Sequence, residues 1–179
     1  MTFDRQAHAV GLDEVLESKE ARMKRQHEWL SRHSSPLISF TVNIPGPYKL
    51  TPSSHKVFEQ GVEAISLACK QHGCDIAARQ LLTKNTGPEG VFAVKAVSAS
   101  VLKKLMIRIE SCHPLGRLMD LDVIGEDGKI ISRKGKQMPR RKCLICEQDA
   151  VVCGRSHRHT LSELTSVIDE MVREHEYSA

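Results

Sequence analysis

Asp120 and Asp122 are the residues best suited to hold a hard metal ion. They stand in Gly116-Arg-Leu-Met-Asp-Leu-Asp-Val123, where apolar and acidic residues alternate from Met119 to Val123. In a strand, residues two apart point to the same face, roughly 7 Å apart. The carboxylates therefore converge while the apolar residues beside them enter the core. Such a pair favours Mg²⁺ with phosphate co-ligands. A solvated acidic face on an edge hairpin gives the same pattern.

Three cysteines and two histidines form a second group. Cys143, Cys146 and Cys153 are followed closely by His157 and His159. Thiolates at such spacing can wrap one tetrahedral Zn²⁺, with an imidazole as the fourth ligand. The spacing is irregular for a zinc finger, and three partly buried thiols in a turn region are the alternative. Nothing suggests export, so we expect the thiols to be reduced.

Positive charge gathers in residues 129–160, which carry nine Lys and Arg against two acids, a net +7. The whole chain carries +4, so the remainder carries −3. Guanidinium and ammonium groups in this segment can hold the phosphates of a polyanionic partner. The predicted phosphate contacts here are Arg133, Lys142, Arg155 and Arg158. A solvated surface or a nucleic-acid tether are the alternatives.

Weaker candidates for substrate contacts lie elsewhere in the chain: Arg22, Arg25, Asn43, Lys49 and Arg117. For the two helical arginines, an exposed helix face is the favoured alternative. Asn43 and Lys49 flank a Pro-Gly-Pro turn that could present a backbone N–H to phosphate or simply end a strand. Arg117 begins the aspartate strand and faces the opposite side if the alternation is strict.

Hydrophobic periodicity and turn residues predict the elements that position these groups. We expect a helix over 12–31, a strand over 37–44, a helix over 52–71, strands over 75–83 and 91–97 around a hairpin turn at 85–90, and a helix over 99–111. Next comes a hairpin with arms at 117–124 and 129–133. Residues 134–159 show no clear period, and Thr160 with Glu163 forms a capping box for a last helix.

The order from residue 37 to 124 is strand, helix, strand, strand, helix, strand. This order is typical of a split βαβ arrangement, an antiparallel-rich sheet with helices on one face. We therefore predict an α+β fold with a nucleotidyltransferase-like site. One domain is expected to span residues 1–179, with the basic, Cys-rich segment 134–159 appended to its core.

Composition limits the class of protein further. Hydrophobic residues make up 40% and charged residues 27%, as in a soluble globular protein. No apolar run is long enough to cross a membrane, and the first residues lack a signal-peptide core, so we expect a cytoplasmic protein without a membrane partner. Aromatic residues are only 4%. With no helix-turn-helix pattern either, this scarcity disfavours a nucleic-acid partner.

Several motifs together resemble one enzyme family. They are Gly116-Arg-Leu-Met-Asp-Leu-Asp-Val123, Arg141-Lys-Cys-Leu-Ile-Cys146, Ala150-x2-Cys153-x-Arg155-Ser156-x2-His159, Thr41-Val-Asn-Ile-Pro-Gly-Pro-Tyr-Lys49 and Ala21-Arg22-Met-Lys-Arg25-Gln26. Over about residues 12–170 the chain is similar to the apo-citrate lyase phosphoribosyl-dephospho-CoA transferases, also called citrate lyase holo-acyl-carrier-protein synthases.

The resemblance implies a transferase of the nucleotidyltransferase type. Its donor substrate would be triphosphoribosyl-dephospho-CoA, its acceptor a serine of the acyl-carrier (gamma) subunit of citrate lyase, and its second product pyrophosphate. Asp120 and Asp122 would then be the catalytic residues and bind Mg²⁺. The synthase that makes the donor is a further partner to consider.

Three other interpretations stay open on the sequence. The chain could be a non-catalytic assembly factor that binds the cofactor or the carrier protein. It could perform the same transfer onto a malonate decarboxylase carrier, whose maturation enzyme also relies on an Asp-x-Asp pair. It could also be a small zinc-stabilised nucleic-acid binder, which would bind generic DNA with a steep salt dependence.

Overall fold

A computed structural model describes residues 7–95, 98–132 and 140–178. The chain forms two compact units, Met1–Ile131 and Ser132–Ala179. The division lies close to residue 134, where the Cys-rich segment was predicted to begin. Within the described ranges, no helix combines the length and the apolar character that a membrane crossing requires.

The first unit contains a sheet and three α-helices in the predicted order. The elements are α1 (Leu12–His33), β1 (Leu37–Val42), α2 (Pro52–Gln71), β2 (Asp75–Lys84), β3 (Gly87–Lys95), α3 (Ala99–Cys112), a short 3₁₀ helix η1 (Gly116–Leu118) and β4 (Met119–Ile124). Local signals set these bounds. Thr51 caps α2 by accepting from the Ser54 amide, with Pro52 in the first turn. Ser34 ends α1 in the left-handed conformation.

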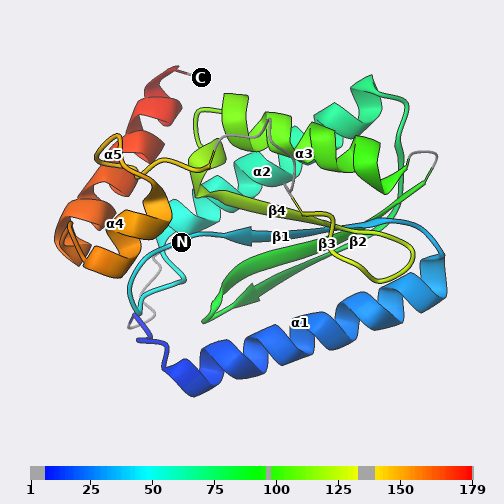
Figure 1. Cartoon of the computed structure of the whole chain (residues 1–179), viewed down its shortest axis with the longest axis horizontal. Coiled ribbons are helices and arrows are strands. Elements are labelled where there is room, and N and C mark those ends of the chain that lie inside the picture. Colours follow the sequence, from blue (N-terminus) through cyan, green and yellow to red (C-terminus); the bar gives the residue numbers. More distant parts are fainter. Residues whose placement is uncertain (1–6, 96–97, 133–139, 179) are drawn as a thin grey trace. The chain divides into compact units, whose positions relative to one another are not determined.

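The sheet has the strand order β2-β3-β1-β4, and every neighbouring pair is antiparallel. Consequently β1 and β2 run in the same direction with β3 between them, and β3 and β4 run in the same direction with β1 between them. Each of these parallel pairs is connected by a helix, α2 or α3 (Figure 1). This is the split βαβ topology, so the α+β prediction and its connectivity are confirmed.

Helices α2 and α3 cover one face of the sheet. Two phenylalanine rings stack between the sheet and α2 on this face. Phe40 of β1 stacks on Phe58 of α2, with centroids 4.9 Å apart and an interplanar angle of 19°. A Cβ at Gly61 would lie 2.2 Å from the Cζ of Phe40. The glycine therefore provides the space that the Phe40 ring fills.

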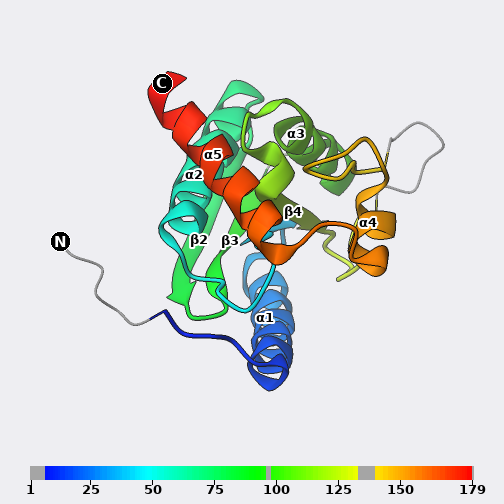
Figure 2. The same cartoon turned by 90° about the vertical axis from the view of Figure 1, so that its left-hand side faces the viewer.

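Helix α1 covers the opposite face, which corrects the prediction that the helices lie on one face (Figures 1 and 2). Trp29 of α1 belongs to a buried apolar cluster with Leu37, Val91, Ala93 and Ile124 of the sheet. Adjacent residues of β1, Leu37 and Ile38, are both fully buried. A strand that is apolar on both sides needs a layer on each face, and a third layer is the result.

The turn between β2 and β3 is shorter than predicted. Only Asn85 and Thr86 separate the strands, so Pro88 lies inside β3 rather than in the loop. Proline lacks an N–H and is disfavoured in a central strand. The ladder between β1 and β3 begins at Thr41 and Glu89, so at Pro88 the strand has a strand partner only in β2, through Thr83. The missing donor therefore breaks no bond to β1.

Of the predicted hairpin after residue 116, the turn and most of the first arm are confirmed, whereas the second arm forms no strand within the described residues. Gly116–Leu118 is a 3₁₀ turn, and only a single bridge, Ile124 to Ile130, follows β4 within the described residues. The Gly125–Gly128 turn itself is present, with the Gly125 amide donating to the Lys129 carbonyl. Ile130 is 61% exposed. A second arm with no buried face gains too little to extend the ladder.

Gly116 allows the 3₁₀ turn to pack against the end of α3. A Cβ at this position would lie 2.4 Å from the Ile109 carbonyl oxygen and 2.6 Å from that of Glu110. Helix backbone cannot move aside as a side chain can. We expect Gly116→Ala to lower the free energy of unfolding by about 1–3 kcal/mol, measured by urea denaturation. Gly11→Ala is the control, because nothing lies closer to its Cβ than 3.8 Å. Equal urea midpoints for the two variants would contradict the packing argument.

The second unit contains α4 (Ala150–Ser156) and α5 (Leu161–Ser178). The Asp149 carboxylate caps α4 by accepting from the Val151 amide. The predicted capping box of α5 is present, with the Glu163 amide donating to Thr160 Oγ1 at 3.2 Å and the Thr160 amide donating to Glu163 Oε2 at 2.6 Å. Helix α4 was not predicted, because seven residues are too few to show a hydrophobic period.

Candidate active site

The two aspartates lie on β4 as the alternation requires. Met119, Leu121 and Val123 are fully buried, whereas Asp120 and Asp122 are half-buried on the other side of the strand. The side chain of Asp122 is 48% exposed. Each aspartate is therefore partly packed against the protein and partly accessible to a bound molecule.

The strand register places hydroxyl groups beside the carboxylates. Asp120 is paired with Thr41 and Asp122 with Ser39 of β1, and directly paired residues share a face of the sheet. Ser39 accepts a 3.0 Å hydrogen bond from Gln26 Nε2 of α1. The aspartates therefore lie on the face that α1 covers, a placement that the sequence did not reveal.

The same polar row continues to a buried acid, Glu89, which is paired with Thr41 from the other side. Its side chain is 5% exposed and is held by three cations. Arg22 Nε donates to Oε2 at 3.0 Å, Arg25 Nη1 to Oε1 at 2.7 Å and Lys84 Nζ to Oε1 at 3.1 Å. Both arginines that were weaker candidates for phosphate contacts thus pair with a protein carboxylate.

The environment of Glu89 favours its ionised form. Burial alone would raise the pKa of this carboxyl, but the charge of Arg22 and the hydrogen bond from Lys84 outweigh burial and hold the pKa below its usual value. Glu89 was predicted to lie in the hairpin turn at 85–90, but it belongs to β3. A single acid preceding the apolar run Val91–Val94 was the signal that could have identified it.

A groove of about 580 Å³ lies between α1 and the edge strand β2. Its charged lining consists of four basic side chains and one acidic one. These are Lys24, Arg25, Arg32, Arg79 and Glu28. Three of the basic residues were not candidates on the sequence, because they come from two elements that only the fold brings together. An anionic group fits the charge of this groove.

Two buried charged residues of α3 cover the free edge of β4. Glu110 Oε1 accepts from the Leu121 amide at 2.9 Å, and Lys103 Nζ donates to the Leu121 carbonyl at 3.0 Å. The same Nζ lies 3.9 Å from Asp122 Oδ1. Lys103 and Glu110 are 6% and 5% exposed. Their spacing of seven residues, two helical turns, was the available signal that they share one face.

The remaining first-unit candidates lie around the turns next to β4. Arg117 belongs to the 3₁₀ turn, not to the strand as predicted. The Asn43 amide donates to the Leu118 carbonyl at 2.8 Å and so continues the β1–β4 ladder beyond both strands. Lys49 Nζ donates to the Ile44 carbonyl, and burial lowers the pKa of Lys49. In the Pro45–Pro47 loop, Pro47 offers its carbonyl to the Val10 amide.

The predicted phosphate contacts of the basic segment belong to the second unit. Lys142 pairs with Glu147 at 2.5 Å, and both side chains are exposed. Arg155 lies on α4 and Arg158 just beyond it, both exposed. Arg133 lies outside the described residues.

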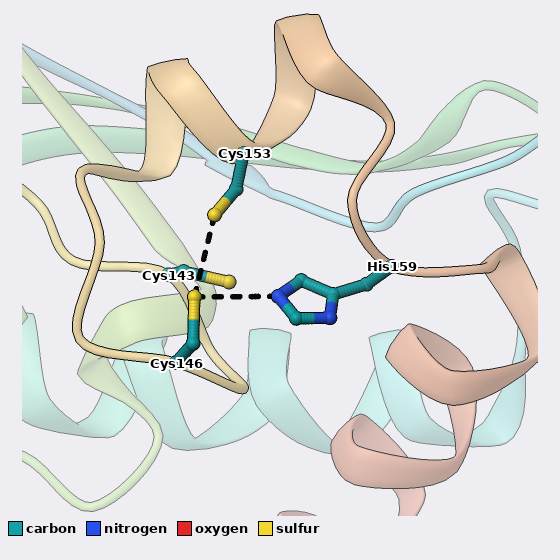
Figure 3. Close-up of side chains that lie close together, drawn as sticks. All are labelled: Cys143, Cys146, Cys153 and His159. Atoms are coloured by element: carbon teal, nitrogen blue, oxygen red, sulfur yellow. Dashed lines mark hydrogen bonds between the residues drawn. The ribbon is translucent and has the colours of Figure 1, made fainter.

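The structure brings four of the five predicted zinc ligands together. The ligand atoms of Cys143, Cys146, Cys153 and His159 all lie within 4.8 Å of one another (Figure 3). His157 does not belong to this group. It is exposed and ends α4 with a positive φ of 48°.

The oxygen-bearing side chains on β4 and the neighbouring β1 fit a magnesium ion. Two half-buried carboxylates and the paired Ser39 and Thr41 supply oxygen, the ligand type that Mg²⁺ prefers. Two carboxylates are too few for an all-protein cage. They suit an ion that keeps water or takes phosphate oxygens, as Mg²⁺ usually does.

Comparison with known protein families identifies the family of this chain. Residues 10–175 match the family described as apo-citrate lyase phosphoribosyl-dephospho-CoA transferase. The chain belongs to this family. The match confirms the resemblance found in the sequence motifs, and it spans both the aspartate pair and the Cys/His group.

Individual relatives agree over nearly their whole length. A Vibrio cholerae O395 protein named "Probable apo-citrate lyase phosphoribosyl-dephospho-CoA transferase" is 54% identical over 170 residues, 95% of this chain and 94% of that protein. Proteins named apo-citrate lyase phosphoribosyl-dephospho-CoA transferase from Shigella boydii serotype 18 and Escherichia coli O157:H7 are each 41% identical over 167 residues, 93% of this chain and 91% of theirs.

Proposed function

We propose that the chain attaches the phosphoribosyl-dephospho-CoA prosthetic group to apo-citrate lyase. The donor is triphosphoribosyl-dephospho-CoA and the acceptor is a serine hydroxyl of the acyl-carrier subunit. Family membership over residues 10–175 supports the activity. The location of the site is inferred from one observation: Asp120 and Asp122 are paired with Thr41 and Ser39 on one face of the sheet.

The reaction is a displacement at the phosphorus next to the donor ribose. The serine oxygen forms a new P–O bond, the bond to the outer two phosphates breaks, and pyrophosphate leaves with the electron pair. The product is a phosphodiester, and the serine proton must be removed. Either carboxylate can accept that proton when the hydroxyl lies within hydrogen-bond reach.

Asp120 and Asp122 would hold Mg²⁺, which when bound neutralises charge on the triphosphate and on the departing pyrophosphate. The chain's own residues orient the carboxylates. Backbone pairing with β1 fixes one side of β4, while Glu110 and Lys103 bind the Leu121 backbone on the other. The Lys103 ammonium near Asp122 adds positive charge where phosphate oxygens would arrive.

The activity is tested by incubating the purified protein with apo-carrier, triphosphoribosyl-dephospho-CoA and Mg²⁺. Intact mass of the carrier should rise by the mass of the prosthetic group, and one pyrophosphate should appear per carrier modified. A parallel reaction with a malonate decarboxylase carrier tests the choice of acceptor. Binding of donor and carrier without mass gain would instead identify an assembly factor.

The basic segment is proposed to dock the carrier, since acyl-carrier proteins are typically acidic. The Arg140 side chain is 87% exposed and lies 3.3 Å from Asp149. We expect the double variant Arg140→Glu, Arg141→Glu to weaken carrier binding about tenfold and donor binding much less, because the charge reversal repels an acidic surface. Titration calorimetry with each ligand measures both. Arg173→Glu, an exposed site on α5, is the control, and an equal loss for both ligands would contradict the docking role.

A further inference from the structure

Three sulfur atoms and one imidazole nitrogen converge in the second unit (Figure 3). Cys146 Sγ lies 3.4 Å from Cys153 Sγ and 3.3 Å from His159 Nε2. In a tetrahedral zinc site with Zn–S bonds of about 2.3 Å, neighbouring ligand atoms are separated by roughly 3.5–3.8 Å. The two distances from Cys146 Sγ are close to these values, and all four ligand atoms lie within 4.8 Å of one another, so one ion could contact them all.

The group is not a disulfide. Cys143, Cys146 and Cys153 are all free thiols, and 3.4 Å is far longer than the roughly 2.05 Å of an S–S bond. A disulfide would also join only two of the three sulfurs. It would not explain why the His159 ring lies beside Cys146.

Local backbone bonds bring the ligands together. The Cys143 amide donates to the Gln148 carbonyl at 2.8 Å, and the Ala150 amide donates to the Arg141 carbonyl at 2.9 Å. These bonds close the loop that carries Cys143 and Cys146. The loop leads directly into α4, whose first turn carries Cys153. His159 follows the end of that helix.

The sulfur of Cys143 also accepts a backbone hydrogen bond, from the Ile145 amide at 3.4 Å. An amide that donates to a sulfur stabilises the thiolate, which is the form that binds metal. The turn between Cys143 and Cys146 forms this bond. The folded loop therefore favours the thiolate form of Cys143, which is the form that binds metal.

Residues 140–160 have almost no apolar core of their own. Cys153 is the single buried residue of this stretch, and Val151 and Val152 are 58% and 52% exposed. A short segment without a core needs another source of stability, commonly a disulfide or a metal ion. Because the one buried side chain is itself a thiol of the cluster, a metal ion is the stabilising element that fits.

We propose that Cys143, Cys146, Cys153 and His159 bind one Zn²⁺ in a closed structural site. Thiolate and imidazole ligands suit zinc, and four protein ligands leave no open position for catalysis. The ion would hold the loop 141–149 against α4 and thereby fix Lys142, Arg155 and Arg158 relative to one another. Binding releases the protons of the thiols that become thiolates.

The proposal is tested on the full-length reduced protein purified without added metal. Elemental analysis should give about one zinc per chain. After zinc removal, Co²⁺ should produce the absorption of tetrahedral thiolate coordination. Cys146→Ser should lose most of the zinc, whereas Cys112→Ser, which changes an exposed thiol outside the cluster, should keep it.

A rescue pair guards against simple misfolding. His159→Ala should lower the zinc content, and His159→Cys should restore it, because four thiolates also form a closed zinc site. Zinc well below one per chain together with no cobalt spectrum would overturn the proposal, as would equal zinc loss in Cys112→Ser. None of these readouts involves prosthetic-group transfer, so the proposed function and the zinc site can fail separately.

Discussion

Replacing either Asp120 or Asp122 by Asn is expected to reduce prosthetic-group transfer about a thousandfold. Asparagine keeps the shape of the side chain but removes the charge that holds a divalent cation. Because Asp122 is half-exposed, the loss of its charge should change folding little. Initial rates of pyrophosphate release at saturating donor and Mg²⁺ measure the effect.

Asp75→Asn is the matched control for this pair. Asp75 is an exposed aspartate at the start of β2 in the same unit, so its variant should transfer at the parent rate. If both β4 variants fold normally yet release pyrophosphate at the parent rate, the catalytic assignment of the aspartate pair is wrong.

Glu89→Gln is expected to lower the free energy of unfolding by about 2–3 kcal/mol at pH 7. The substitution removes the only carboxylate that Arg22, Arg25 and Lys84 share in the contacts described above. Those cations are 26%, 18% and 32% exposed, so water relieves part of the cost and the full penalty of a buried pair does not apply. Urea denaturation measures the change.

The pH dependence gives this prediction a second readout. The folded-state pKa of Glu89 lies below its usual value, so its contribution to stability is complete above the unfolded pKa. It is lost as the pH falls through the folded pKa. Parent and Glu89→Gln proteins should therefore differ at pH 7 and converge in acid. Glu59→Gln, an exposed position on α2, should follow the parent throughout. A constant difference down to low pH would exclude the charge of Glu89 as its cause.

Asp120 and Glu89, one residue from each prediction, lie in the same polar row of the sheet. Asp120, Thr41 and Glu89 are successive partners across β4, β1 and β3. Loss of Glu89 would loosen the contact of α1 with this row, which carries Asp120 at its other end. If a substitution of Arg22 or Arg25 lowers activity, loss of stability should therefore be tested first, and loss of phosphate binding second.

The sequence by itself determined the order of the helices and strands in the first unit and the alternation of β4. These depend on local signals, namely hydrophobic period, capping residues and turn glycines, which act within a few residues. It also determined the family, because the motifs are long and in order. The segment from Cys143 to His159 could be recognised as a metal-site candidate because all of its ligands lie close together in the sequence.

Only the tertiary structure decided which groups share a surface. Strand pairing put the aspartates on the α1 face beside Ser39 and Thr41. Packing of α3 on the edge of β4 brought Lys103 to Asp122, and a buried Glu89 proved to bind Arg22 and Arg25. It also selected His159 over His157 for the thiol cluster. Each of these outcomes depends on register or side-chain direction between segments that are distant in sequence or separated by a turn, and a one-residue shift in either would reverse them.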